Sequence, residues 1–138
     1  MNINKIILGG LIGGVVALIL GFVFYGVLLT DFFSSNAGSA TGVMRADDEM
    51  LWGPMIIGHV AWGVLFAYIF ERWANISTFK GGAKAGAVIA VLVSLTYNMI
   101  NLATTHVMNL TGALVDVVVM ALVAAVTAGT VGWFLGRK

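Results

Sequence analysis

The stretch GALVDVVVMALVAAVTAGTVGWFLG, from Gly112 to Gly136, decides the fold class of this chain. Asp116 is its only formally charged residue. A helix needs about 20 predominantly apolar residues to cross the hydrocarbon core of a bilayer, and this stretch exceeds that length. The sequence therefore predicts a membrane-spanning helix with one carboxyl group inside it.

The composition of the whole chain indicates an integral membrane protein. Of its 138 residues, 60% are hydrophobic and only 9% are charged, whereas soluble domains carry about 25% charged residues. The surplus apolar surface must face the lipid bilayer. The absence of cysteine excludes disulfides, thiolate nucleophiles and cysteine-ligated metals. A net charge of +1 gives no reason to expect a nucleic-acid partner.

Four segments are long and apolar enough to span, at about 6–29, 51–70, 85–107 and 112–136. Backbone groups cannot stay unpaired in lipid, so all four should be α-helical. The connection between the last two is very short, which makes them an antiparallel hairpin. We expect an all-α, polytopic membrane protein in which 1–138 form one antiparallel four-helix domain. The first segment is longer than the apolar region of a signal peptide, so we expect it to be retained.

The basic residues predict the orientation of these spans, because positive charge collects on the cytoplasmic side. Arg45 lies alone in the connection 31–50, which should therefore be the outer loop. This loop has a weak pattern for a short interfacial helix. Both termini are then cytoplasmic, on the side that holds Lys5, Arg72, Lys80, Lys84, Arg137 and Lys138.

Small residues recur at intervals of about four in every span, a spacing that lets membrane helices pack closely. The glycines that we expect to make these contacts are Gly9, Gly13, Gly21, Gly63, Gly82, Gly86 and Gly132.

Each small-residue row leads outward to a polar side chain. The four side chains are Tyr25, His59, Asn98 and Asp116, and Asn101 lies one turn beyond Asn98. A charged residue at mid-span costs about 2.5–3.5 kcal/mol on the insertion scale, so a position facing the protein interior is favoured. We predict an interior polar cluster in the outer half of the bilayer. It either handles an ion or a proton, or it holds the helices together by hydrogen bonds.

Two kinds of chemistry lack support in the sequence. His59, His106 and Asp116 have the composition of a two-histidine, one-carboxylate metal site, but nothing in their spacing requires one. We therefore expect no metal and no cofactor. No nucleophile lies near a general base, so we expect no enzymatic activity, and an intramembrane enzyme is the last of the alternatives.

Several segments resemble a group of small four-helix bacterial membrane proteins classed as a domain of unknown function. They are GFVFYGVLLTDFF, HVAWGVLFAYIFERW, FKGGAKAG, NLATTHVMNLTGALVD and GTVGWFLGRK, and together they span most of the chain. The resemblance implies a bacterial origin, hence the inner membrane, and the four-span topology. It implies no catalytic residue.

Two classes of function follow from these observations. The first is a homo-oligomer that translocates a proton, an ion or a small solute through the polar cluster. The second is an accessory or assembly subunit of a larger membrane complex, because glycine rows on all four spans offer more close-packing surface than one small bundle needs.

Overall fold

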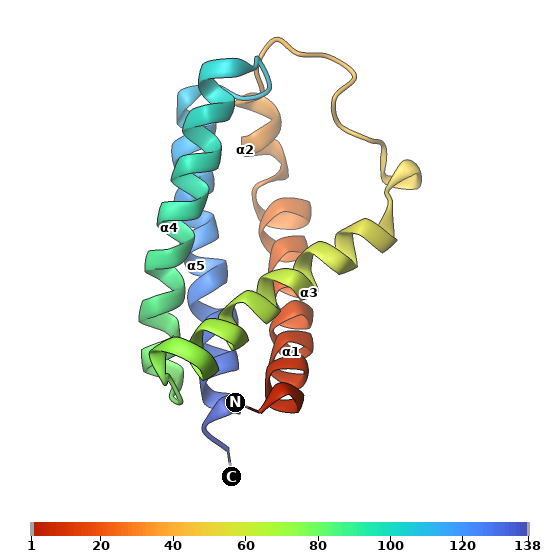
Figure 1. Ribbon diagram of the computed structural model, residues 1–138. Helices are drawn as coiled ribbons and strands as arrows, with labels where there is room; N and C mark the ends of the chain where they lie inside the picture. Colours follow the sequence, from red (N-terminus) through yellow and green to blue (C-terminus); the bar gives the residue numbers. More distant parts are fainter. Residues whose placement is uncertain (1, 138) are drawn as a thin grey trace.

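The computed structural model describes residues 2–137, and four long helices account for most of that chain (Figure 1). All four are long and apolar enough to cross a membrane, which confirms the predicted all-α, multi-pass fold. The helices are α1 (Ile3–Gly21) with a π-helical continuation (Phe22–Leu28), the short α2 (Thr30–Ser35), α3 (Trp52–Ile69) with a second π-helical continuation (Phe70–Ala74), α4 (Phe79–Thr104) and α5 (Leu110–Leu135).

Side-chain caps set where three of the helices begin. The side chains of Asn2, Thr78 and Asn109 accept hydrogen bonds from the first-turn N–H groups of α1, α4 and α5. Such caps satisfy donors that have no partner within the helix. The third span consequently starts at Phe79 rather than near residue 85, and its first turns carry exposed Lys80 and Lys84.

Helices α4 and α5 form the predicted antiparallel hairpin, and glycines let their backbones meet. A Cβ atom on Gly86 would lie 2.7 Å from the Ala124 carbonyl oxygen, and one on Gly82 would overlap the Ala128 carbonyl oxygen. A Cβ on Gly132 would lie 2.6 Å from the Thr78 carbonyl oxygen. Any larger residue at these places would push the two helices apart.

Helices α1 and α3 cross at a second close contact, again through glycine. A Cβ on Gly14 would lie 2.7 Å from Val60 Cα, and one on Gly63 would lie 2.5 Å from Gly14 N. A Cβ on Gly13 would lie 2.7 Å from Val131 Cγ2 of α5 and 3.1 Å from Gly63 Cα of α3. Gly9 has more room, since its nearest neighbour, in Phe134, would be 3.4 Å away.

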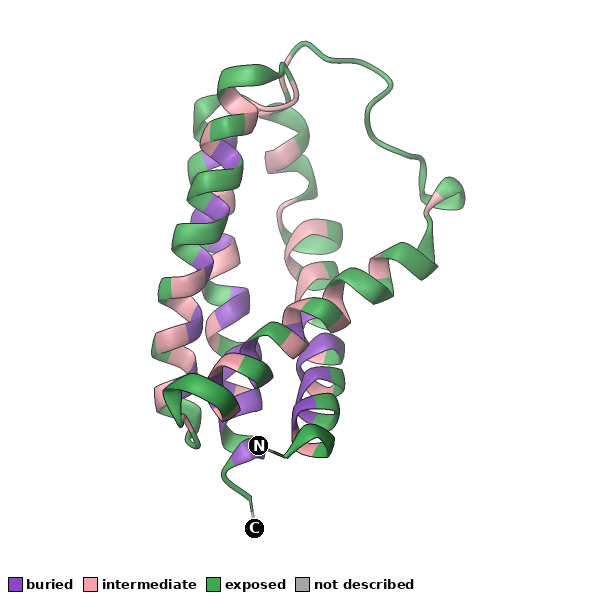
Figure 2. Ribbon diagram, in the orientation of Figure 1, coloured by how far each residue is buried: buried purple, intermediate pink, exposed green. Residues whose placement is uncertain are grey.

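The core lies toward the end of the bundle that carries the termini (Figure 2). Phe66, Phe70 and Val131 are fully buried there. Helix α3 crosses the other long helices obliquely, and its outer end points away from α4 and α5 (Figure 1). A regular four-helix bundle would cover the central part of α1 and α5 on this side, and α3 leaves it partly open.

The two ends of the chain are held together at this end of the bundle. Lys5 Nζ donates to the carbonyl oxygens of Leu135, at 3.4 Å, and Arg137, at 2.9 Å. The backbone N–H of Asn2 donates to the Glu71 carboxylate at 3.0 Å. The first turn of α1, the last turn of α5 and the end of α3 are therefore linked.

The connection between α1 and α3 is divided into two parts. Its first part begins with helix α2. The residues after α2 pair with the α4–α5 connection: Gly38 N donates to Val107 O at 2.9 Å, and Ala40 N donates to His106 O at 3.0 Å. Residues 41–49 are exposed throughout and contain a single 3₁₀ turn, Asp47–Glu49. The first part is thus fastened to the α4–α5 hairpin, and the second runs free to α3.

Candidate functional site

Asp116 joins three of the four long helices through its two carboxyl oxygens. Its Oδ1 accepts a hydrogen bond from the Tyr25 hydroxyl at 2.6 Å, and its Oδ2 accepts one from Asn98 Nδ2 at 2.6 Å. Tyr25 lies on the π-helical continuation of α1, Asn98 on α4 and Asp116 on α5. We refer to Tyr25, Asn98 and Asp116 as the polar triad.

The local fold holds both donors in place. Asn98 is only 6% exposed, and its amide nitrogen also donates to the Ser94 carbonyl oxygen at 2.9 Å, so both of its protons are used. Tyr25 lies where the helix widens: Leu29 N donates to Phe24 O at 2.8 Å, and the Thr30 hydroxyl donates to Tyr25 O. Such π-helical turns are frequent at functional sites.

The two oxygens of the Asp116 carboxyl group face hydrogen-bond partners of different kinds. Asn98 Nδ2 is a donor only, so Oδ2 acts as the acceptor in this bond. A tyrosine hydroxyl can donate or accept, so a proton on Oδ1 would merely reverse the bond to Tyr25. The triad can therefore take up one proton on the Tyr25 side without losing either hydrogen bond.

His59 makes no hydrogen bond to the triad, although the row along α3 predicted it in the same polar cluster. Its Nδ1 bonds to the carbonyl oxygen of Met55, one turn away on its own helix, at 2.8 Å. Its Nε2 faces α1, 3.3 Å from the position that a Cβ on Gly21 would take. The reason is the oblique course of α3, which turns the predicted face of this helix toward α1.

Asn101 and His106 also remain outside the triad. The Asn101 amide donates to Tyr97 O on its own helix at 3.0 Å. His106 is exposed in the α4–α5 connection. Within residues 2–137, no group of three histidine, aspartate or glutamate side chains lies close enough to hold a metal ion.

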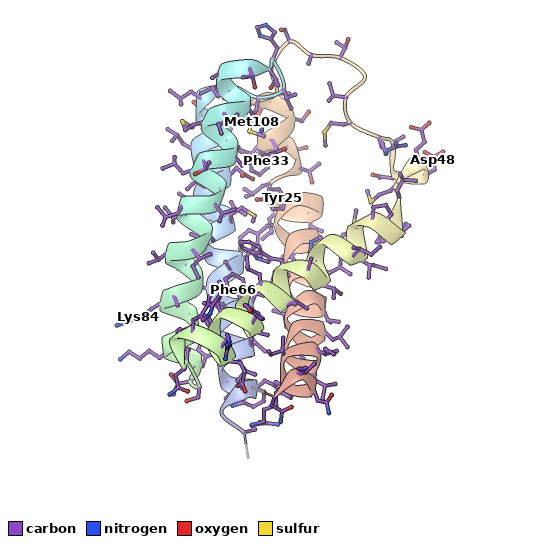
Figure 3. The ribbon with its side chains drawn as sticks, viewed as in Figure 1. Tyr25, Phe33, Asp48, Phe66, Lys84 and Met108 are labelled. Atoms are coloured by element: carbon purple, nitrogen blue, oxygen red, sulfur yellow. The ribbon has the colours of Figure 1, made fainter. Side chains whose placement is uncertain are left out.

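A cavity beside the triad lies between α1, α3 and α5, and we call it the central cavity. Its volume is about 450 Å³. Its walls come from α1 and its π-helical continuation, from α3 and from α5, and the residues that form them are Ala17, Gly21, Tyr25, Pro54, Met55, Gly58, His59, Trp62, Met120 and Val123. Tyr25 and His59 both line it, from opposite helices. Tyr25 lies in the upper half of the bundle, on the side of α5 that faces α3 (Figure 3).

A second, smaller cavity lies on the other side of the triad, at the outer end of α4 and α5. This outer cavity has a volume of about 120 Å³, and Asn98, Asn101, Thr105 and Met108 are among the residues that line it. Asp116 lines neither cavity. Tyr25 therefore separates the carboxyl group from the central cavity, and Asn98 separates it from the outer one.

Two buried polar atoms have no hydrogen-bond partner within residues 2–137: Trp62 Nε1 and Thr127 Oγ1. Trp62 also lines the central cavity. Trp62 was not among the residues predicted for the site. Its position in the span is the signal that could have found it. Tryptophans of membrane proteins gather at the two interfaces, whereas Trp62 lies near the middle of its span.

Comparison of the chain with protein-family models, with curated proteins and with solved structures finds no significant match. The resemblance to the group of small four-helix membrane proteins stays a prediction, and the function has to be argued from the site.

Proposed function

We propose that the protein translocates a small solute or a proton. In this proposal the central cavity and the outer cavity give access to the polar triad from two sides. The observation that carries the proposal is the position of the triad between two cavities. Tyr25 borders the central cavity and Asn98 borders the outer one, and both are hydrogen-bonded to the same carboxyl group.

The chemistry of the triad favours a proton or a solute that carries one. The Asp116 carboxyl group can be protonated at Oδ1, where the Tyr25 hydroxyl reverses its bond. Tyr25 would exchange that proton with whatever occupies the central cavity. Ionisable groups at membrane depth commonly serve such relays.

The closed inner half of the bundle supports a homo-oligomer as the working unit. Phe66, Phe70 and Val131 are fully buried and fill the space between α1, α3 and α5 below the central cavity. A single bundle of four helices is also too narrow to enclose a wide pore. The path would be completed by a second copy of the chain or by movement of α3.

We further propose that the protein lies in the bacterial inner membrane with both termini in the cytoplasm. The positive-inside rule supports this orientation. Lys5, Arg72, Lys80 and Arg137 flank helix ends that lie at the same end of the bundle as the two termini (Figure 1). Arg45 is in the free part of the connection at the other end.

The test is proton flux into liposomes that contain the purified protein and an internal pH-sensitive dye. Asp116→Asn keeps the size of the side chain and removes the site of protonation, so we expect the flux after a pH jump to fall to the level of empty liposomes. Thr96→Val is the matched control, because this exposed hydroxyl bonds only within α4 and lines neither cavity. Equal flux from Asp116→Asn and the parent chain would contradict the proposal.

One observation favours the second function, an accessory subunit of a larger complex. Both oxygens of Asp116 are already occupied by donors on two other helices, as expected for a group that only holds the bundle together. The glycine rows give this function less support than the sequence suggested, because Gly63, Gly82 and Gly86 contact helices of the same chain.

The mass of the complex purified in mild detergent from its native membrane separates the two functions. A single species at an integer multiple of 14.5 kDa supports the homo-oligomer. Co-purification with other subunits at a fixed ratio supports the accessory role, and Asp116→Asn would then lower the yield of the complex.

A further inference from the structure

We propose that the central cavity binds an uncharged, lipid-soluble small molecule that carries one hydrogen-bond donor, which His59 Nε2 accepts. This site is separate from the Asp116 carboxyl group, which does not line the cavity. The proposal does not depend on whether the protein moves protons or solutes.

The hydrogen bond of His59 on its own helix determines what its ring offers to the cavity. Nδ1 lies 2.8 Å from the Met55 carbonyl oxygen, which can only accept, so Nδ1 carries the proton. In the neutral ring Nε2 is then an acceptor with a free lone pair. The ring therefore offers a fixed acceptor, held in orientation by a bond that involves no other helix.

A glycine on the facing helix keeps this acceptor uncovered. A Cβ atom on Gly21 would lie 3.3 Å from His59 Nε2, closer than most such contacts, so any larger side chain would cover the nitrogen. Gly21 itself is part of the cavity wall, as is His59. The free lone pair thus borders an open volume.

The remaining walls indicate an apolar ligand without charge. They are formed by side chains such as Met55, Trp62, Met120 and Val123, and no lysine, arginine, aspartate or glutamate contributes to them. Small-molecule sites commonly enclose about 300–1,000 Å³, with mostly apolar walls and a few polar groups that fix orientation. A volume of about 450 Å³ falls in that range.

The route into the cavity runs along the outer half of α3. Pro54 and Gly58 line the cavity and are exposed. A Cβ on Gly58 would meet no atom within 4 Å, so this side of α3 has no neighbouring helix within the chain. In a membrane this face borders lipid, and a lipid-soluble molecule would enter sideways from the bilayer.

The experiment uses 4-bromophenol, an apolar ring with one hydroxyl donor whose bromine quenches tryptophan fluorescence. Trp52, Trp73 and Trp133 are exposed and are replaced by phenylalanine, so that the emission comes from Trp62 in the cavity wall. The full chain in lipid nanodiscs is titrated with 4-bromophenol and with 4-bromoanisole, which has no donor. Empty nanodiscs give the partitioning of each probe, and dialysis with the unsubstituted chain repeats the measurement without the tryptophan replacements.

We expect saturable quenching by 4-bromophenol, with an affinity roughly three- to tenfold above that for 4-bromoanisole, as one hydrogen bond provides. His59→Phe keeps an aromatic ring and should remove this preference. Gly58→Leu places a branched side chain at the open side of the cavity, on the proposed entry route, and should abolish saturation, whereas Gly53→Leu, at another open position of α3 outside the cavity wall, should not.

Three results would overturn the inference: no saturation above empty nanodiscs, equal affinity for the two probes, or saturation that survives Gly58→Leu. Binding without proton flux would leave the inference standing and contradict translocation of protons. Flux in the absence of saturable binding would do the reverse.

Discussion

The crossing of α1 and α3 provides the most direct test of the fold that surrounds the central cavity. At Gly63 a Cβ atom would lie 2.5 Å from Gly14 N and would overlap the Gly10 carbonyl oxygen. These obstacles are backbone atoms and cannot rotate away. Since non-bonded atoms prefer separations of about 3.5–4.0 Å, α1 and α3 would have to move apart by roughly 1 Å to admit an alanine.

Gly58→Ala is the matched substitution, five residues away on the same helix with no atom within 4 Å of the added methyl group. Both changes remove a helical glycine and gain the same helix propensity, about 0.5–1 kcal/mol. Their difference therefore isolates the cost of overpacking, which is typically about 1–3 kcal/mol. Gly58→Ala should be more stable than the parent, and Gly63→Ala should be less stable than Gly58→Ala by that amount.

The free energy of unfolding can be measured for both variants by titration with sodium dodecyl sulfate in mixed micelles, followed by circular dichroism. The cavity adds a second readout, because separation of α1 and α3 should change the fluorescence of Trp62. Gly63→Ala with the stability of Gly58→Ala would show that the two helices do not meet at this crossing.

Three further predictions concern bonds between segments that are distant in the sequence. A double-mutant cycle of Tyr25→Phe and Asp116→Asn should give a coupling of about 1–2 kcal/mol in the free energy of unfolding, because their hydroxyl–carboxyl bond links α1 to α5; additive effects would contradict that bond. Asn109→Ala removes the cap of α5 and should cost about 1 kcal/mol. The same substitution should speed hydrogen exchange of the Gly38 amide, because this amide donates to Val107 O, two residues from Asn109. Unchanged exchange at Gly38 would contradict the pairing of the two loops. Lys5→Met should increase exchange in the last turn of α5, where Lys5 holds two carbonyl groups; Lys84→Met, at an exposed position on α4, is the control.

The spans were predictable from the sequence because bilayer thickness and hydropathy determine them almost alone. The residues at which the spans begin and end were less predictable. The third span was placed from residue 85 because Lys80 and Lys84 looked extramembranous, yet Thr78 caps a helix that includes both. Long basic side chains can reach the interface from inside a helix end, so charge is a weak marker of where a helix begins.

The polar residues show where reasoning from one helix at a time fails. Asn98 and Asp116 were both expected in the interior polar cluster, and the short connection between α4 and α5 brings them within hydrogen-bond distance. His59 was placed by the same rule and lines the central cavity with Tyr25, but it makes no hydrogen bond to the triad, because the oblique α3 turns its ring toward α1. The angle of α3 depends on contacts such as Gly14 against Val60, which involve two helices at once. The π-helical turns that carry Tyr25 also have no signature in a four-residue row.

The oblique course of α3 has a consequence for the surrounding bilayer. A 23-residue span at 1.5 Å per residue is about 35 Å long, but its inclination reduces the height that it covers. The acidic turn Asp47–Glu49 precedes it directly and needs water or headgroups. The leaflet on that side should therefore dip toward this helix, so that the protein thins the membrane on one flank. Lipids with longer acyl chains would resist that dip and push α3 upright. Acyl-chain length would then control the width of the space between α3 and α1.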